Sequence, residues 1–177
     1  MRSKRKPEQG TDALPDAQEV RAQIRTRALG LLARREHATL ELTRKLLQRG
    51  YPADLIEPVL QDLSSEGLLS ETRYADEWVR SRIARGQGPV KIRAEMRLRG
   101  LSDAQVQQAL TGADADWGRL AAEVRRKRFG TAVPDRLTER ARQSRFLESR
   151  GFTADHIRTA LGTADEPSPP DQVRGRL

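Results

Sequence analysis

The chain repeats itself about every fifty residues, and an Arg-Gly pair marks each copy: Arg49-Gly50, Arg99-Gly100 and Arg150-Gly151. Apolar residues recur at fixed offsets from these pairs, at Leu46, Met96 and Leu147 upstream and at Ile56, Val106, Ile157, Leu60, Leu110 and Leu161 downstream. Residues at these offsets form a helical stripe that one copy cannot bury alone, so neighbouring copies are expected to share a core. The repeat therefore predicts a modular helical array.

Local signals predict three helices in each copy. In the first copy the apolar stripes are Ile24, Ala28, Leu31 and Leu32, then Leu42, Leu46 and Leu47, then Leu55, Ile56, Val59 and Leu60. Gly50 ends the second helix, because glycine adopts the left-handed C-terminal cap without steric cost; Gly100 and Gly151 play the same part. We expect repeats over 21–69, 70–113 and 114–162.

Helix starts differ among the copies. Ser102 and Gln105 are spaced for a capping box, and Thr153 can cap the corresponding helix of the last copy. Pro52 offers no side-chain acceptor, so it is expected at the first helical position of its helix. Pro89 is expected at the same position after the turn Gly86-Gln87-Gly88, where the Walker spacing of a phosphate loop is missing.

The aromatic residues and one amide bear on the cores. Tyr74 and Trp78 share a helical face, and Trp78 and Trp117 are interpreted as core residues rather than base-stacking platforms, since each lies in an apolar stripe. Gln143 takes the place held by Leu42 and Ile92, which predicts a weaker core or a shifted register in the third copy.

Composition excludes several classes of protein. Aromatic residues make up only 4% of the chain, cysteine is absent and there are two histidines, which argues against a large single core, disulfides and a zinc site. No apolar run approaches the length of a spanning helix and the basic start lacks the apolar stretch of a signal peptide, so we expect a cytoplasmic protein without a membrane partner. The polar segments 1–20 and 163–177 are expected to be disordered tails.

Positive charge is concentrated in the second and third copies. The net charge is +8, and 80–99 holds seven basic residues against the single acid Glu95. Clustered arginines recognise phosphates or carboxylates in bidentate fashion, which favours polyanions or acidic proteins as partners. The predicted contact residues are Arg80, Arg82, Arg85, Lys91, Arg93, Arg97, Arg99, Arg125, Arg126 and Arg128. Replacing Arg93 and Arg97 by Glu should weaken such contacts while helical content stays intact.

Catalytic constellations are missing from the sequence. His37 and His156 lie far apart, and no nucleophile motif is present. Asp114 and Asp116 form an acidic pair, but two ligands do not make a metal shell, so they are interpreted as a turn or helix start. We expect neither an enzyme nor a protein with a cofactor or metal.

In its motifs the chain resembles the RecX regulatory proteins, which bind the RecA recombinase. These motifs are Arg35-Glu36-His37 with Glu41-Leu42, Arg73-Tyr74-Ala75 with Trp78-Val79-Arg80 and Arg82, Gly86-x-Gly88, Ile92-Arg93-x-Glu95-Met96 and Arg99-Gly100-Leu101. The resemblance covers about 21–162. Where the family often has serine the chain has Ala38, so Thr39 is expected to cap that helix.

The resemblance implies an all-α, elongated, curved array of three tandem three-helix repeats that lies in the helical groove of RecA filaments on single-stranded DNA. There it would limit filament extension and inhibit ATP hydrolysis, strand exchange and coprotease activity. The expected form is a monomer. Two alternatives stay open: an autonomous DNA-binding helical protein and an adaptor for another acidic protein. The basic pI near 10.7 favours the first of these.

Overall fold

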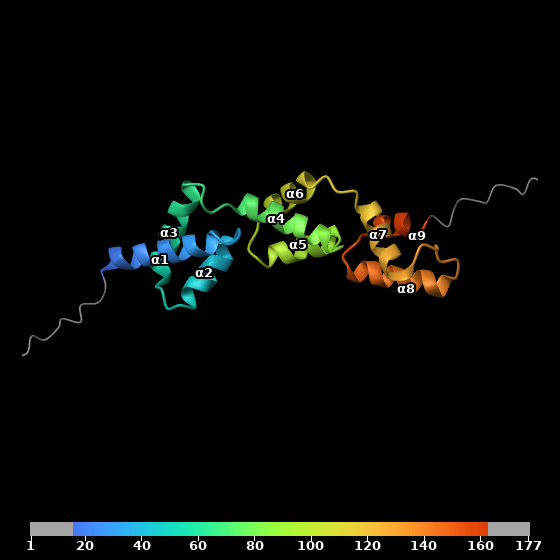
Figure 1. Ribbon diagram of the computed structural model, residues 1–177, viewed down its shortest axis with the longest axis horizontal. Helices are drawn as coiled ribbons and strands as arrows, with labels where there is room; N and C mark the ends of the chain where they lie inside the picture. Colours follow the sequence, from blue (N-terminus) through green and yellow to red (C-terminus); the bar gives the residue numbers. More distant parts are fainter. Residues whose placement is uncertain (1–15, 163–177) are drawn as a thin grey trace, which may run out of the picture. The chain divides into compact units, whose positions relative to one another are not determined.

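The computed structural model describes residues 16–162, and Figure 1 traces them as successive α-helices. Their bounds are α1 (Ala17–Leu32), α2 (Thr39–Leu47), α3 (Ala53–Ser65), α4 (Glu71–Ala84), α5 (Pro89–Arg97), α6 (Asp103–Gly112), α7 (Trp117–Phe129), α8 (Leu137–Ser149) and α9 (Ala154–Leu161). Across these residues the regular structure is helical throughout. The predicted all-α fold with three tandem three-helix repeats is confirmed, whereas its elongated, curved form stays a prediction.

The predicted tails fall mostly on 1–15 and 163–177, which lie outside the described residues. α1, however, begins at Ala17, inside the segment 1–20 that composition assigns to a tail. The side chain of Asp16 accepts a hydrogen bond from the backbone N–H of Gln18 (3.4 Å) and so caps this helix. The repeat boundaries at 69–70 and 113–114 stay predictions.

The chain divides into two compact units, the first ending at Ser70 and the second beginning at Glu71. The first unit holds α1 to α3, and the second holds α4 to α9. In each repeat the first and third helices pack together more extensively than either packs with the second helix. The third helix therefore folds back along the first, and each repeat can close a core of its own.

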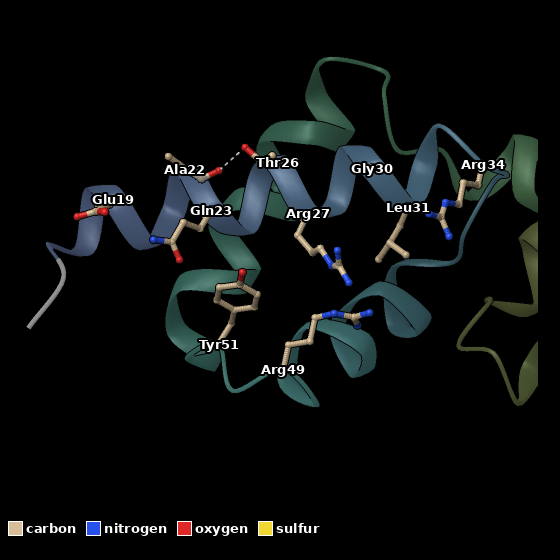
Figure 2. A pocket seen from close by; sticks show the side chains of 10 residues that line it. All are labelled: Glu19, Ala22, Gln23, Thr26, Arg27, Gly30, Leu31, Arg34, Arg49 and Tyr51. Atoms are coloured by element: carbon tan, nitrogen blue, oxygen red, sulfur yellow. Dashed lines mark hydrogen bonds between the residues drawn. The ribbon is translucent and has the colours of Figure 1, made fainter.

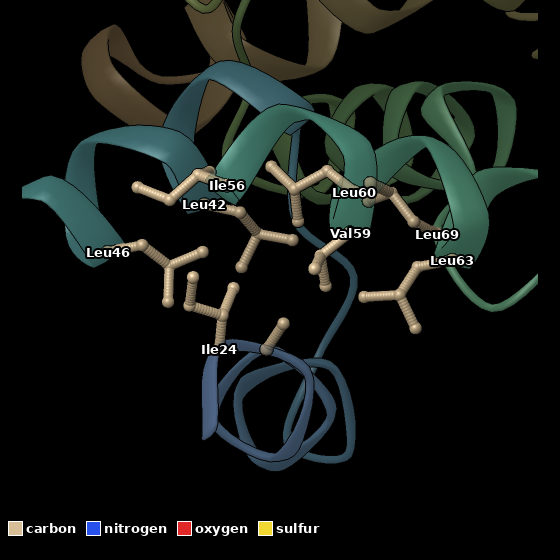
Figure 3. Packing of buried hydrophobic residues seen from close by; sticks show 9 residues of the cluster. Ile24, Leu42, Leu46, Ile56, Val59, Leu60, Leu63 and Leu69 are labelled. Carbon is tan, nitrogen blue, oxygen red and sulfur yellow. The ribbon is translucent and has the colours of Figure 1, made fainter. Parts of the chain in front are cut away.

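The first unit closes a core of apolar side chains, which Figure 3 shows between α1, α2 and α3. Its buried members are Ile24, Ala28, Leu42, Leu46, Ile56, Val59, Leu60, Leu63 and Leu69. Burying each leucine or isoleucine stabilises the fold by about 1.5–3 kcal/mol. Because all nine residues belong to one repeat, the expectation of a core shared between neighbouring copies is wrong for this unit.

The helix ends test the expected caps. Ser102 and Gln105 form the predicted capping box, Thr153 caps α9 with His156 completing a second box, and Pro89 is the first residue of α5. Two expectations are wrong by one residue. Pro52 is the N-cap of α3 rather than its first helical residue, and Ala38, not Thr39, occupies the N-cap of α2 without a side-chain hydrogen bond.

The second and third repeats meet at a tight backbone joint inside the second unit. The N–H of Gly88 donates to the carbonyl oxygen of Arg150 (2.8 Å), and the N–H of Val90 donates to that of Gly151 (3.0 Å). A Cβ at position 88 would lie 2.3 Å from the Gly151 oxygen, and Gly151 itself has φ +88° and packs against Lys91. Glycine is therefore required here for close approach between repeats, a role beyond the predicted turn and helix cap.

The third repeat replaces part of its apolar core with polar side chains. Ala121, Leu147, Phe152, Ile157, Ala160 and Leu161 form the apolar part. Gln143 is buried, as its place in the repeat requires, and it lies beside Arg125, which is also buried. Gln143 and Arg125 form a hydrogen-bonded polar pair in this core, and the predicted weaker core or shifted register stays a prediction.

Candidate nucleic-acid interface

Arg125, a predicted contact residue, belongs to the interior of the third repeat. Only 4% of the residue is exposed, and its guanidinium donates to the carbonyl oxygens of Ala132 (2.8 Å) and Thr131 (3.2 Å). It also donates to Oε1 of Gln143 at 3.5 Å. The assignment of Arg125 to a contact surface is therefore wrong: a charge buried at this depth is held by the carbonyls of its own repeat and is not offered to a partner.

Arg82 and Arg99 stack on Trp78 in the second repeat. The guanidinium carbon of each lies 3.8 Å from the centre of the indole ring. Glu95 holds both arginines, since its carboxylate pairs with Arg82 (2.8 Å) and its backbone carbonyl accepts from Arg99 (2.7 Å). Cation–π contacts of this kind contribute about 0.5–2 kcal/mol. Trp78 and Trp117 are half-buried rather than core residues, and guanidinium groups occupy the surface of Trp78 that a base would use.

Arg93 and Arg97 tie α5 to the following helix. Arg93 donates to Oε1 of Gln107 (2.9 Å), and Nε of Arg97 lies 2.6 Å from Oδ1 of Asp103. Replacing both arginines by Glu would place new carboxylates against these partners. Such a variant would change these surface contacts as well as binding, so arginines without such partners are better probes of binding; intact helical content in the variant stays a prediction.

Exposed cations without an ion pair form the remaining group. Within residues 16–162, Arg80, Arg85, Arg126 and Arg128 are exposed and make no side-chain salt bridge. Lys91 is half-buried where α5 meets Gly151. Of the other predicted contact residues, Arg82 and Arg97 pair with carboxylates. Arg93, Arg99 and Arg125 donate to amide or backbone oxygens of their own repeat.

A cleft between the second and third repeats gathers part of this group. Its volume is about 340 Å³, and it is lined by Ala84, Arg85, Gly86, Val124, Lys127, Arg128, Phe146 and Arg150. Arg85 follows the end of α4, Lys127 and Arg128 belong to α7, and Arg150 caps the end of α8. The guanidinium of Arg150 lies 5.2 Å from the ring centre of Phe146. Among these lining residues none is acidic, so the cleft has the chemistry of a phosphate site.

The Gly88–Gly151 joint fixes this basic cleft. The carbonyl group that accepts from Gly88 belongs to Arg150, whose side chain lines the cleft. Arg85 lies just before the joint on the second repeat, so the joint sets the separation of cations from both repeats. Sequence analysis found Arg85 and Arg128 by local density but missed Lys127 and Arg150, because only the fold brings α7 and α8 to the end of α4.

The first unit carries a basic groove that sequence analysis did not identify. Figure 2 shows it between one face of α1 and the turn joining α2 to α3, with a volume of about 580 Å³. Arg27, Arg34 and Arg49 line it beside Tyr51 and Gly30. The spacing of Arg27 and Arg34 was available from the sequence, whereas their proximity to Arg49 and Tyr51 depends on the fold.

The histidines and the acidic pair have structural roles. Nδ1 of buried His37 lies 3.2 Å from Oε1 of Glu41, and burial lowers the pKa of His37. Burial also raises the pKa of Glu41, but hydrogen bonds from Arg35, Lys45 and His37 outweigh it and lower that pKa to about 2. Asp116 caps α7 by accepting from the N–H of Arg119 (2.9 Å), which confirms its interpretation as a helix start.

Among the described residues, no group of three histidines or acidic side chains is arranged to hold a metal ion. None of the helices within 16–162 has the length and apolar character needed to cross a membrane.

Comparison with known proteins matches all three repeats to one family. The models of the first, second and third three-helix domains of RecX match residues 25–63, 70–110 and 119–161. The regulatory protein RecX of Halorhodospira halophila is 49% identical over 152 residues, which cover 86% of this chain and 92% of that protein. RecX of Pseudomonas savastanoi pv. phaseolicola is 48% identical over 134 residues, covering 76% and 86%.

Solved structures agree on the fold. The crystal structure of a regulatory protein RecX has a TM-score of 0.70 at 24% identity and covers 82% of this chain and 72% of its own. That of RecX from Lactobacillus salivarius has a TM-score of 0.68 at 21% identity, covering 81% and 96%. With three matched domains in order and close relatives over most of its length, the chain belongs to the RecX family of regulatory proteins.

Proposed function

We propose that this chain regulates the RecA recombinase by binding RecA filaments on single-stranded DNA in their helical groove. Bound there, it limits filament extension and inhibits ATP hydrolysis, strand exchange and coprotease activity. Membership of the RecX family carries this proposal. The chain acts as a non-catalytic monomer in the cytoplasm and needs no cofactor.

The basic cleft of the second unit supports a direct part for phosphates in this binding. Arg85, Lys127, Arg128 and Arg150 present four cations on one concave surface with no carboxylate among the lining residues. The backbone joint at Gly88 and Gly151 holds the two contributing repeats together, so the backbone positions that carry these cations are set before a partner arrives. Preorganised cations lose less entropy on binding than scattered ones.

The test is the single-stranded-DNA-dependent ATP hydrolysis of RecA from the same organism, with this protein titrated at substoichiometric ratios. Progressive loss of hydrolysis is expected, and loss at low ratios indicates blocked extension rather than competition for DNA. An unchanged rate would contradict the proposed function, and unchanged hydrolysis together with DNA binding would identify an autonomous DNA-binding protein.

A cleft variant locates the contact. Arg85→Gln/Arg128→Gln removes two charges from the cleft, and Arg136→Gln/Arg145→Gln removes two exposed charges elsewhere in the third repeat. Loss of two phosphate contacts should raise the protein concentration needed for half-inhibition by about tenfold. Equal potency of the two double variants would remove the cleft from the interface.

A further inference from the structure

The groove of the first unit follows a continuous stripe of α1. Its lining residues on that helix are Glu19, Ala22, Gln23, Thr26, Arg27, Gly30 and Leu31, which recur with helical spacing, and Arg34 lines it just beyond the end of the helix. At a rise of 1.5 Å per residue the stripe from Glu19 to Leu31 is about 18 Å long. Arg49 and Tyr51 form the opposite wall. The groove is therefore elongated along α1, a shape that suits an extended chain.

The arginines in this groove have no carboxylate partner within the described residues, unlike Arg25 on the opposite face of α1. On that face Arg25 makes a bidentate pair with Glu66 (2.5 and 2.9 Å), and the hydrogen bond from Arg25 lowers the pKa of Glu66. In the part of the chain that the structure describes, Arg27 and Arg34 form no salt bridge, and Arg49 donates only to the backbone carbonyl of Lys45 (2.9 Å). Three exposed guanidinium groups are thus available to an anionic ligand.

Tyr51 and Gly30 make the groove more than a charged surface. Figure 2 shows the ring of Tyr51 below α1, next to Gln23 and to one side of Arg49, so an aromatic group borders the cations. A Cβ at Gly30 would meet no atom within 4 Å, which leaves the wall between Arg27 and Arg34 open. Cations that follow a backbone together with an aromatic ring for stacking are the features that bind single-stranded nucleic acids. An acidic protein surface would use the cations but not the ring.

We propose that the groove lined by Arg27, Arg34, Arg49 and Tyr51 binds a single strand of nucleic acid directly, without RecA. The phosphates lie on the arginines and a base stacks on Tyr51. Glu19, the acidic residue among those lining the groove, repels phosphates and marks the end at which the strand leaves. The proposal deepens the proposed function by giving the first unit its own DNA contact, separate from the cleft of the second unit.

The first test uses one substitution that adds charge without disturbing the fold. Gly30→Glu places a carboxylate between Arg27 and Arg34, and glutamate favours an exposed helical position more than glycine does. Gly112→Glu is the matched control, because Gly112 is also an exposed helical glycine with open space around it. Binding of the full chain to a fluorescein-labelled 20-mer of thymidylate is followed by anisotropy at about 50 mM salt.

Gly30→Glu should weaken binding by about tenfold or more relative to Gly112→Glu, because it introduces repulsion beside two phosphate contacts. The pair Arg27→Gln/Arg34→Gln should reduce the slope of log affinity against log salt by about 1.4, and Arg21→Gln/Arg44→Gln should change affinity less. Tyr51→Leu should lose about tenfold while Tyr51→Phe retains binding, since phenylalanine keeps the stacking ring.

Equal binding by Gly30→Glu and Gly112→Glu would overturn the proposal. So would a groove variant that binds thymidylate normally but no longer binds RecA filaments, since the groove would then receive an acidic protein surface. Since thymidylate binding is measured without RecA, failure of the ATP hydrolysis test would reject the regulatory role and leave the groove's result intact.

Discussion

The first and third repeats use one position of the same repeat in opposite ways. Leu42 and Gln143 occupy equivalent places, and both are buried. Leu42 packs among apolar side chains, whereas Gln143 accepts from Arg125 and donates to Oε1 of Glu139 (3.1 Å). A three-helix repeat of this size therefore tolerates a polar core residue when hydrogen-bond partners enter the core with it.

The carbonyl groups that hold Arg125 in the third repeat come from the connection between α7 and α8. Arg125 reaches the carbonyl oxygens of Thr131 and Ala132 in that connection, so one buried guanidinium ties together the helix, the loop and Gln143. The first repeat has Leu42 at the equivalent place and closes this part of its core by apolar burial. The buried polar residue of its own connection, His37, pairs with Glu41 instead. The comparison teaches that a residue's place in the repeat determines whether it is buried. The groups that the connecting loop supplies determine whether a polar side chain can be buried there.

The largest expected effect comes from placing the third repeat's residue in the first. Leu42→Gln loses apolar burial and leaves an amide without a partner, which should cost about 3–5 kcal/mol. Both tryptophans, Trp78 and Trp117, lie in the second unit, so their fluorescence follows that unit while circular dichroism follows both. In urea, the dichroism transition should move to lower concentration with little change in fluorescence. A cost below about 1 kcal/mol would break the comparison.

Removing the guanidinium from the third repeat is expected to have the next largest effect. Arg125→Met leaves Gln143 with an unpaired acceptor and should cost about 1–3 kcal/mol, seen in the tryptophan fluorescence transition. The double variant Arg125→Met/Gln143→Leu should recover part of this, because apolar residues of similar volume often replace a buried polar network. If the double variant were less stable than Arg125→Met, the two residues would not form one network.

Acid should weaken the first repeat through Glu41. Its pKa falls from 4.5 to about 2 on folding, so its contribution is complete above pH 4.5 and is lost as the pH falls towards 2. After allowance for solvent screening this amounts to about 1–2 kcal/mol. The lowered pKa of His37 acts in the same direction below pH 6.5. Urea titrations at several pH values should show a smaller dependence in Glu41→Gln; an unchanged dependence would assign the acid sensitivity to other groups.

The smallest expected effect lies at the helix caps, where the two repeats are alike. α2 and α8 begin after Ala38 and Arg136, and neither residue makes a side-chain cap. Ala38→Ser and Arg136→Ser should each add about 0.5–1 kcal/mol, since serine can accept from the third N–H of the helix. Thermal unfolding measures both, with Ser102→Ala as the control of opposite sign. If only one of the two variants were more stable, the difference between the two cores would also affect the helix ends.

The sequence predicts part of the candidate interface, because charge density along the chain identifies some of the exposed arginines. Arg85 and Arg128 stand out by local charge density, but the same density includes Arg125, which is buried, and Arg93 and Arg97, which hold α6. Periodicity reports which face of a helix is polar. It does not report which neighbouring helix that face meets, so Arg150 and the groove of Arg27, Arg34 and Arg49 were missed.

The sequence by itself determined the helices, the three repeats and most of their ends, because apolar periodicity, glycine caps and capping boxes are local properties of the chain. It also carried the family, through motifs whose order and spacing are specific. Only the tertiary structure decided that each outer repeat closes its own core, that Gly88 and Gly151 join two repeats, and which arginines stay exposed. These outcomes depend on contacts between residues far apart in the chain, where the geometry of packing, not local preference, sets burial and charge.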